Sequence, residues 1–297
     1  MVTPLSYTLF EILGLILLML CAIYRIKKKD MPTISILMEL VVILAFGMSL
    51  EILAVQSGRY SYPPFNLMLF HVPLIIGIGW AVILFSIMWL TDSLKIPEWS
   101  RVFVDAFLAL LIDLNMDAVA IRDIYTFGTI SSGMWAWGIP LDAEWFGVPW
   151  FNFSGWWFII ASMSAALRLT RYISRKKNTT IIHIIYPVMA YFIASLFLFL
   201  TGLLAIIIPS LIIFIIQMSF SVIIIAWKWR DADKKITLKN DFPVYFVPFS
   251  FQAFFLTLML IKGYYIGAIP ILVMSCFAFL LNMLFLWGAT IIGRRAK

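Results

Sequence analysis

The sequence predicts an all-α bundle of about nine transmembrane helices, and two observations support this fold class. The chain of 297 residues is 63% hydrophobic and only 12% charged, with a mean hydropathy of +1.02, whereas soluble domains are about half apolar and about a quarter charged. The apolar residues also gather in stretches of about 20, the length that a helix needs to cross a bilayer core. The sequence therefore excludes a soluble globular protein and predicts a single integral-membrane domain over residues 1–297.

Nine stretches are long and apolar enough to cross the membrane. In chain order they are approximately Leu5–Tyr24, Thr33–Val55, Val72–Leu90, Val102–Ile121, Phe153–Ile173, Ile184–Leu200, Leu203–Ala226, Phe242–Ile261 and Tyr265–Ile292. Only Thr201-Gly202 separates the sixth from the seventh, where glycine permits a tight turn. Without that turn the bundle would have eight spans. The last two stretches have a clearer turn signal between them, Lys262-Gly263-Tyr264.

The basic residues predict the orientation of the chain in the membrane. With nine spans, all but three of the 22 Lys and Arg residues fall on one side, and the exceptions are Arg59, Arg122 and Lys262. Cytoplasmic loops collect basic residues, so we expect the N-terminus outside and the C-terminus in the cytoplasm of a multi-pass protein in the cell membrane. The net charge of +7 then reflects topology and contacts with lipid head groups, and no nucleic-acid partner is expected.

The longest segment between spans, residues 122–152, is predicted to be an extracytoplasmic loop rich in tryptophan. Six of the 12 tryptophans fall between positions 135 and 157. A long loop without a fold of its own is usually functional. Trp135, Trp137 and Trp156 fit two interpretations equally well, an interfacial aromatic belt or the wall of a pocket.

Acidic residues inside membrane spans are costly, and a functional role is their default interpretation. The predicted spans contain Glu11, Glu39, Glu51, Asp105, Asp113 and Asp117. Glu39 and Asp105 fall near the inner ends of their spans, where we expect Lys or Arg of the adjoining loops to pair with them. The other four fall in the outer halves. Asp113 and Asp117 are four residues apart and therefore share one helix face.

The outer acids have a structural and a functional interpretation. In the structural one they belong to a buried polar network, in which Asp117 pairs with Arg122 and Glu51 with Arg59. Only these two arginines are nearby for four carboxyl groups, however, so some of the acids are expected to be protonated. A buried carboxylic acid can donate a proton, and Asp113, Asp117 and Glu51 are the candidate catalytic residues.

The sequence predicts no metal site and no cofactor. The only two cysteines, Cys21 and Cys276, fall inside apolar runs. No spacing typical of zinc or iron–sulfur ligands is present.

Several short motifs are similar to those of a known family. They are Glu51, Gly58-Arg-Tyr60-Ser-Tyr62, Val72-Pro73, Gly79-Trp80-Ala, Asp113 with Asp117, Trp135-Ala-Trp137, and the run from Gly147-Val-Pro149-Trp150 through Asn152-Phe153-Ser-Gly155-Trp156. Together they resemble the integral-membrane carotenoid biosynthesis family that includes bisanhydrobacterioruberin hydratase and gamma-carotene 1'-hydroxylase (CruF). The resemblance covers about residues 45–160.

The resemblance implies addition of water across the terminal isopropylidene double bond of an acyclic carotenoid within the bilayer. Asp113 or Asp117 would protonate the alkene, a tertiary carbocation would form, and water would capture it. Glu51 or the other Asp would position or deprotonate the water. The expected substrate-binding residues are Tyr60, Tyr62, Trp135, Trp137, Asn152 and Trp156, because aromatic faces stabilise a nearby cation and the polar groups hold water. Besides this lipophilic substrate, membrane lipids and other enzymes of carotenoid synthesis are the candidate partners.

The same residues fit other functions. A cyclase acting on a carotenoid or terpene end would use the same acid and the same aromatic residues. Asp113-x-x-x-Asp117 resembles a fragment of a Mg²⁺–diphosphate motif, as in an intramembrane prenyltransferase, although such sites usually use two acidic sets. Buried acids also relay protons in transporters, but no internal repeat supports that function.

Overall fold

The computed structural model confirms an all-α bundle. It describes residues 3–94, 96–174, 179–228 and 240–291, with side chains as far as residue 284. The helices are α1 (Leu5–Lys28), α2 (Thr33–Gln56), α3 (Leu74–Ser93), α4 (Glu98–Ala120), α5 (Trp150–Ser174), α6 (Thr180–Gly202), α7 (Leu204–Ile207), α8 (Ser210–Lys228), α9 (Phe242–Lys262) and α10 (Ile269–Ile291). Each of the nine predicted stretches corresponds to one long helix, and α7 is a single short turn.

Six of the described helices are long and apolar enough to cross a membrane by length and composition. They are α1, α2, α3, α6 with α7, α8 and α9. Helix α4 contains several acidic side chains and lies at the centre of the bundle, against α3, α5, α8, α9 and α10. Nearly all of its residues are buried, so its polar side chains face other helices instead of lipid. The protein is a membrane protein whose polar groups are concentrated in its core.

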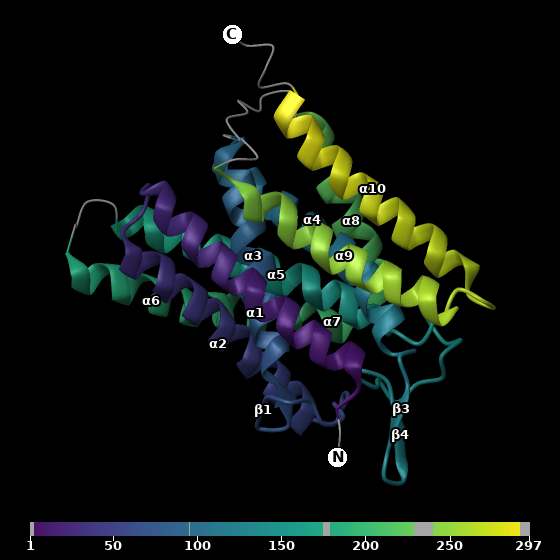
Figure 1. Cartoon of the computed structure of the whole chain (residues 1–297). Coiled ribbons are helices and arrows are strands. Elements are labelled where there is room, and N and C mark those ends of the chain that lie inside the picture. Colours follow the sequence, from purple (N-terminus) through teal and green to yellow (C-terminus); the bar gives the residue numbers. More distant parts are fainter. Residues whose placement is uncertain (1–2, 95, 175–178, 229–239, 292–297) are drawn as a thin grey trace.

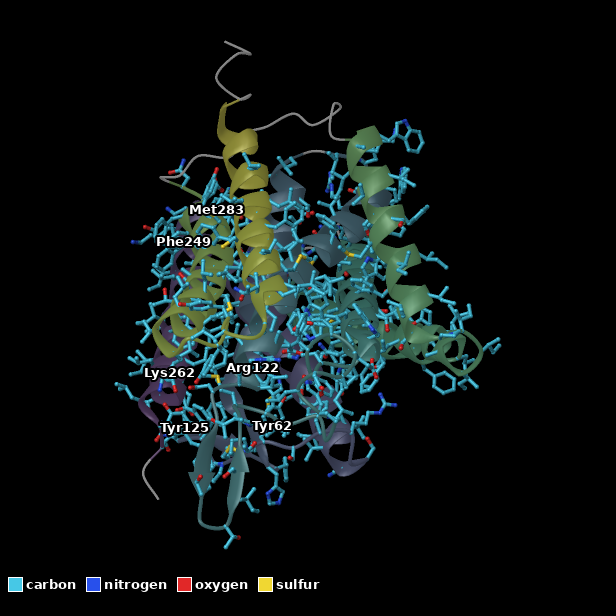
Figure 2. The ribbon with its side chains drawn as sticks, turned by 90° about the vertical axis from the view of Figure 1, so that its right-hand side faces the viewer. Tyr62, Arg122, Tyr125, Phe249, Lys262 and Met283 are labelled. Atoms are coloured by element: carbon cyan, nitrogen blue, oxygen red, sulfur yellow. The ribbon has the colours of Figure 1, made fainter. Side chains whose placement is uncertain are left out.

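Two small hairpins mark one end of the bundle, called here the hairpin end. Strands β1 (Met68–Leu69) and β2 (Val72–Pro73) form one, and β3 (Tyr125–Phe127) and β4 (Ile130–Ser132) form the other. Helix α1 begins at this end, and α10 finishes at the opposite one (Figure 1). Tyr62, Arg122 and Tyr125 lie at the hairpin end, whereas Phe249 and Met283 lie nearer the other (Figure 2).

The hairpins correct two predicted boundaries. The third span begins at Leu74 and not at Val72, because Val72-Pro73 pairs with β1 and a residue before proline favours an extended backbone. The predicted loop 122–152 contains β3 and β4 and ends where α5 begins, at Trp150. Asn152 therefore lies in the first turn of a helix, where its position is better defined than in a loop.

A break separates the sixth and seventh stretches, but it lies later than the predicted turn at Thr201-Gly202, because α7 carries the helical segment on to Ile207 and the extended residue Ile208 follows. Helix α6 ends at Gly202, and α8 begins at Ser210, directly after Pro209, since proline favours a helix start and cannot continue the preceding helix. Helices α6 and α8 both pack against α5.

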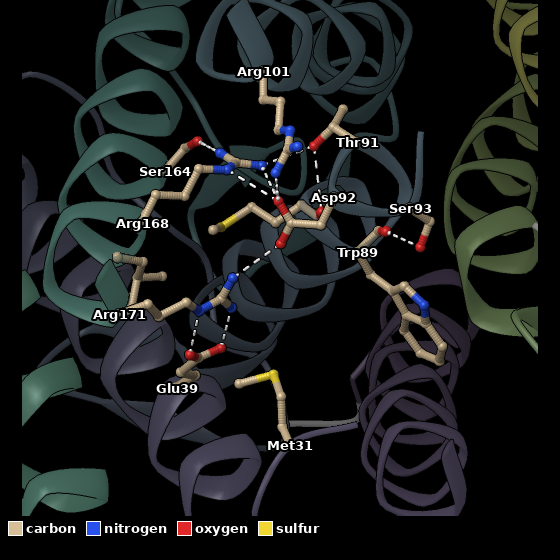
Figure 3. A network of polar contacts seen from close by, with 12 residues as sticks. Met31, Glu39, Trp89, Thr91, Asp92, Ser93, Arg101, Ser164, Arg168 and Arg171 are labelled. Atoms are coloured by element: carbon tan, nitrogen blue, oxygen red, sulfur yellow. Dashed lines mark hydrogen bonds and ion pairs between the residues drawn. The ribbon is translucent and has the colours of Figure 1, made fainter. Parts of the chain in front are cut away.

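Three arginines surround one carboxylate at the end of the bundle opposite the hairpins (Figure 3). Asp92, at the end of α3, lies 3.3 Å from Arg101, 3.1 Å from Arg168 and 3.0 Å from Arg171. Arg101 belongs to α4, whereas Arg168 and Arg171 lie one turn apart on α5. Asp92 thus connects three helices.

Arg168 and Arg171 also neutralise two fully buried acids, Asp105 and Glu39. The predicted pairing of these acids with basic residues is confirmed, but the partners lie on α5 and not in the adjoining loops. Asp105 accepts a hydrogen bond of 2.6 Å from Arg168. Glu39 on α2 accepts two from Arg171, at 2.6 and 2.5 Å, and one from Tyr186 of α6 at 2.6 Å. Figure 3 shows the contacts of Asp92 and Glu39 with the arginines as one connected set. We call Glu39, Asp92, Asp105, Arg101, Arg168 and Arg171 the arginine network.

Asp105→Asn tests the structural role of this network. Breaking a buried ion pair costs about 3–5 kcal/mol, and we expect the lower end, about 3 kcal/mol, because Asp92 still faces Arg168. SDS-induced unfolding in mixed micelles measures the change in the free energy of unfolding. Lys262→Gln at an exposed position is the control, with an expected change within about 0.5 kcal/mol. If both variants unfold as the wild type does, the network contributes no stability.

Candidate active site

Three buried carboxyl groups come from two helices at the hairpin half of the bundle. Glu51 lies near the end of α2, and Asp113 and Asp117 lie one turn apart near the end of α4. The helical repeat places the two aspartates on one face.

Asn152 joins the two aspartates. Its side-chain nitrogen donates to Asp113 Oδ2 at 2.9 Å and to Asp117 Oδ2 at 2.6 Å. An amide nitrogen has two hydrogens, so each carboxyl group accepts one of them. Asp113 Oδ1 is buried and has no hydrogen-bond partner among the described residues. The start of α5 fixes Asn152 in this position, because Glu144 accepts a hydrogen bond of 2.6 Å from the backbone N–H of Trp150.

Glu51 accepts hydrogen bonds from three neutral donors. They are the hydroxyl of Tyr60, the hydroxyl of Tyr62 at 2.6 Å, and the indole N–H of Trp80 at 3.0 Å. Trp80 comes from α3 and reaches α2 because of Gly47, four residues before Glu51. A Cβ atom at position 47 would lie 2.6 Å from the Trp80 ring, so a larger residue there would displace the indole.

The two tyrosines remain hydrogen-bond donors at physiological pH. Burial raises the pKa of both phenols above the ordinary value of a tyrosine, and the nearby Glu51 carboxyl group raises it further. Both Tyr60 and Tyr62 therefore stay protonated and can hold a carboxylate or a water molecule.

Two cavities adjoin the acids. The larger, called here the main cavity, has a volume of about 880 Å³, and the smaller, the end chamber, has about 40 Å³. Glu51, Tyr60, Trp137, Asn152 and Trp156 line both. The end chamber is large enough for a water molecule and offers the several polar partners that a buried water needs.

Eight of the nine predicted site residues line these cavities. Tyr62, Asp117 and Trp135 line the end chamber together with the five shared residues. Asp113 is the exception and reaches the site through Asn152. The predicted residues therefore come together from α2, α4, α5 and the two segments that contain the hairpins.

Aromatic rings form much of the wall. Trp156 stacks on Trp80, with ring centroids 3.9 Å apart and an angle of 26° between the planes. Tyr60 lies edge-on to Trp137 at 4.5 Å. This tryptophan cluster surrounds a cavity, which supports the pocket interpretation over a simple interfacial belt.

The structural interpretation predicted ion pairs of Asp117 with Arg122 and of Glu51 with Arg59, and neither is formed. Arg122 donates to the backbone carbonyl groups of Ala118, Leu141 and Phe146 instead of to Asp117. Arg122 thereby connects the end of α4 with the segment before α5.

Arg59 also has a contact other than the expected one with Glu51. Its guanidinium group lies 5.8 Å from the centroid of the Phe151 ring. Glu11 does not join the outer acids. It accepts hydrogen bonds from Asn66 at 2.5 Å and from the backbone N–H of Leu67 at 2.9 Å, because its face of α1 packs against the first hairpin segment.

Sequence reasoning did not assign a role to Trp80, although it lies within one of the motifs. Its place inside an apolar span could have indicated a role, because the N–H of a buried tryptophan needs a hydrogen-bond partner. Among the described residues, no group of three or more His, Cys, Asp or Glu is placed to hold a metal ion.

A comparison with family models gives one match. The model described as "Carotenoid biosynthesis protein" matches residues 6–220, a segment that contains all nine predicted site residues. No curated protein and no solved structure matches the chain significantly. Since the matched segment is well over half of the chain, the protein belongs to the carotenoid biosynthesis protein family.

Proposed function

We propose that the protein is a carotenoid hydratase that adds water across the terminal isopropylidene double bond of an acyclic carotenoid end. One observation carries this proposal. Glu39, Asp92 and Asp105 are paired with arginines, whereas the acids at the cavities contact neutral donors among the described residues. An acid without a cationic partner is free to exchange a proton during a reaction.

Asp117 is the proposed proton donor because it lines the end chamber. Two buried carboxyl groups that share one amide repel each other when both are charged, so Asp113 and Asp117 hold one proton between them. In the first step the O–H bond of the acid breaks and a C–H bond forms at the CH carbon of the alkene. The positive charge then lies on the carbon with two methyl groups.

Glu51 is the proposed base for the water. A water molecule in the end chamber would lie beside Glu51 and the hydroxyl of Tyr62. As its oxygen bonds to the cation, Glu51 takes a proton from it, which leaves a tertiary alcohol. Return of that proton to the aspartate pair restores the enzyme, and the net reaction consumes one water.

The aromatic wall stabilises the cation. A desolvated cation over an aromatic face gains about 2 kcal/mol, and Trp137 and Trp156 line both cavities. The basic residues predict that the hairpin end faces outside, where water reaches the site and the product hydroxyl stays hydrated at the head groups.

Asp117→Asn and Asp113→Asn test the acid. General acid catalysis contributes about 10²–10⁴-fold, so we expect a loss of that order for Asp117→Asn and a loss for Asp113→Asn. The assay is pigment mass spectrometry of cells that accumulate lycopene or its C50 relative with the same ends, followed by rates with purified protein. Glu11→Gln makes the same chemical change at the same end, outside the cavities, and should keep wild-type turnover.

The wild-type products decide between the competing functions. A gain of one water per end, labelled when the reaction is run in H₂¹⁸O, supports hydration. An isomer of unchanged mass would instead indicate a cyclase, and strict dependence on Mg²⁺ would indicate a prenyltransferase. Unchanged pigments in cells with folded protein in the membrane would overturn the proposal.

Trp156→Leu tests the stabilisation of the cation. Removing about 2 kcal/mol should lower kcat roughly 30-fold, because 1.36 kcal/mol corresponds to tenfold. Trp156→Phe retains an aromatic face and should lose much less. Equal losses in the two variants would assign Trp156 a packing role only.

A further inference from the structure

The main cavity is larger than the reacting end of a carotenoid needs. Its volume of about 880 Å³ lies near the top of the range of about 300–1,000 Å³ for small-molecule sites. Its lining includes apolar and small residues of four helices, which we call the apolar arm: Leu50, Leu53 and Ala54 on α2, Phe158 and Ile159 on α5, Leu198 and Gly202 on α6, and Ala205 on α7.

The rim of the apolar arm is exposed. Leu53 is 61% exposed, and Gly202 and Ala205 are also exposed. They belong to α2 and to α6 with α7, which are long and apolar enough to cross a membrane. An exposed surface between such helices lies against acyl chains, since the bilayer core contains no water.

The lining of the main cavity also includes charged and aromatic groups from outside the apolar arm. Arg59 lies over the Phe151 ring, and Phe151 lies edge-on to Trp137 at 5.5 Å between ring centroids. All three residues line the cavity. An apolar chain that entered past Arg59 would have to pass a guanidinium group. A chain that entered past the rim would meet the apolar or small residues Leu53, Gly202 and Ala205.

We propose that the carotenoid enters sideways from the bilayer, between α2 and α6, and that its polyene lies in the apolar arm beside Gly155. This inference rests on the proposed function for the identity of the ligand. Gly155 lies one turn after Asn152 on α5 and lines the main cavity. A Cβ atom added there meets no atom within 4 Å, so a side chain at position 155 would project into free space in the path of the polyene.

Gly155→Phe tests the route by filling the cavity. Leu196→Phe is the matched control, because it places the same new side chain on an exposed position of α6 that does not line the cavity. Each change is made in the Asp117→Asn background, so that pigment is bound without turnover. Bound lycopene is measured by visible absorption and induced circular dichroism of protein in nanodiscs, and kcat/KM is measured in the wild-type background.

We expect Gly155→Phe to reduce bound lycopene and kcat/KM at least tenfold, Gly155→Ala to have a smaller effect, and Leu196→Phe to have none. Ala205→Phe, at the exposed rim, is a second variant in case Gly155→Phe does not fold, and it should raise KM more than it lowers kcat. The proposed route would be overturned if Gly155→Phe and Ala205→Phe both bind as much lycopene as the Asp117→Asn parent. It would also be overturned if that parent binds no lycopene.

The outcomes separate this inference from the proposed function. Hydration with the wild-type kcat/KM in both Gly155→Phe and Ala205→Phe would overturn the route and leave hydration intact. Pigment binding that is lost in Gly155→Phe, in a protein that never hydrates its ligand, would support the route and overturn hydration.

Discussion

The cost of burying carboxyl groups among apolar helices is the constraint on which the rest of this structure depends. A buried charge must be paired, or the group must be neutral. At one end of the bundle Asp92 and its neighbours meet three arginines, and the result is a stable connection between α2, α3, α4, α5 and α6. At the hairpin end the acids meet phenols, an indole and an amide, so no cation among the described residues holds them in the charged form there.

The loop segments complete a site that the helices alone would leave open. Helices α2 and α4 provide the acids, but Tyr60, Tyr62 and Trp135 come from the segments between helices. Because α5 begins at Trp150, Asn152 reaches both aspartates from a defined helical position. The arginine network connects the opposite ends of the same helices, so the two polar regions are separate within one bundle.

The position of the cavities suits a reaction between an apolar chain and water. The end chamber is lined by hydrogen-bonding groups, whereas the apolar arm reaches an exposed rim between membrane helices. In the proposed reaction, water and polyene therefore approach the same double bond from different environments. The aromatic rings lie between the two and favour a transient positive charge.

The sequence by itself determined the helical bundle, the extent of nearly every helix, and the shared face of Asp113 and Asp117, because these depend on hydropathy and on the local helical repeat. It also indicated eight of the ten residues that line the end chamber. Only the tertiary structure decided that Glu11 is excluded, that Trp80 binds Glu51, and that Asn152 joins the aspartates. Partners on different helices depend on how those helices pack, and a one-dimensional pattern does not contain that information.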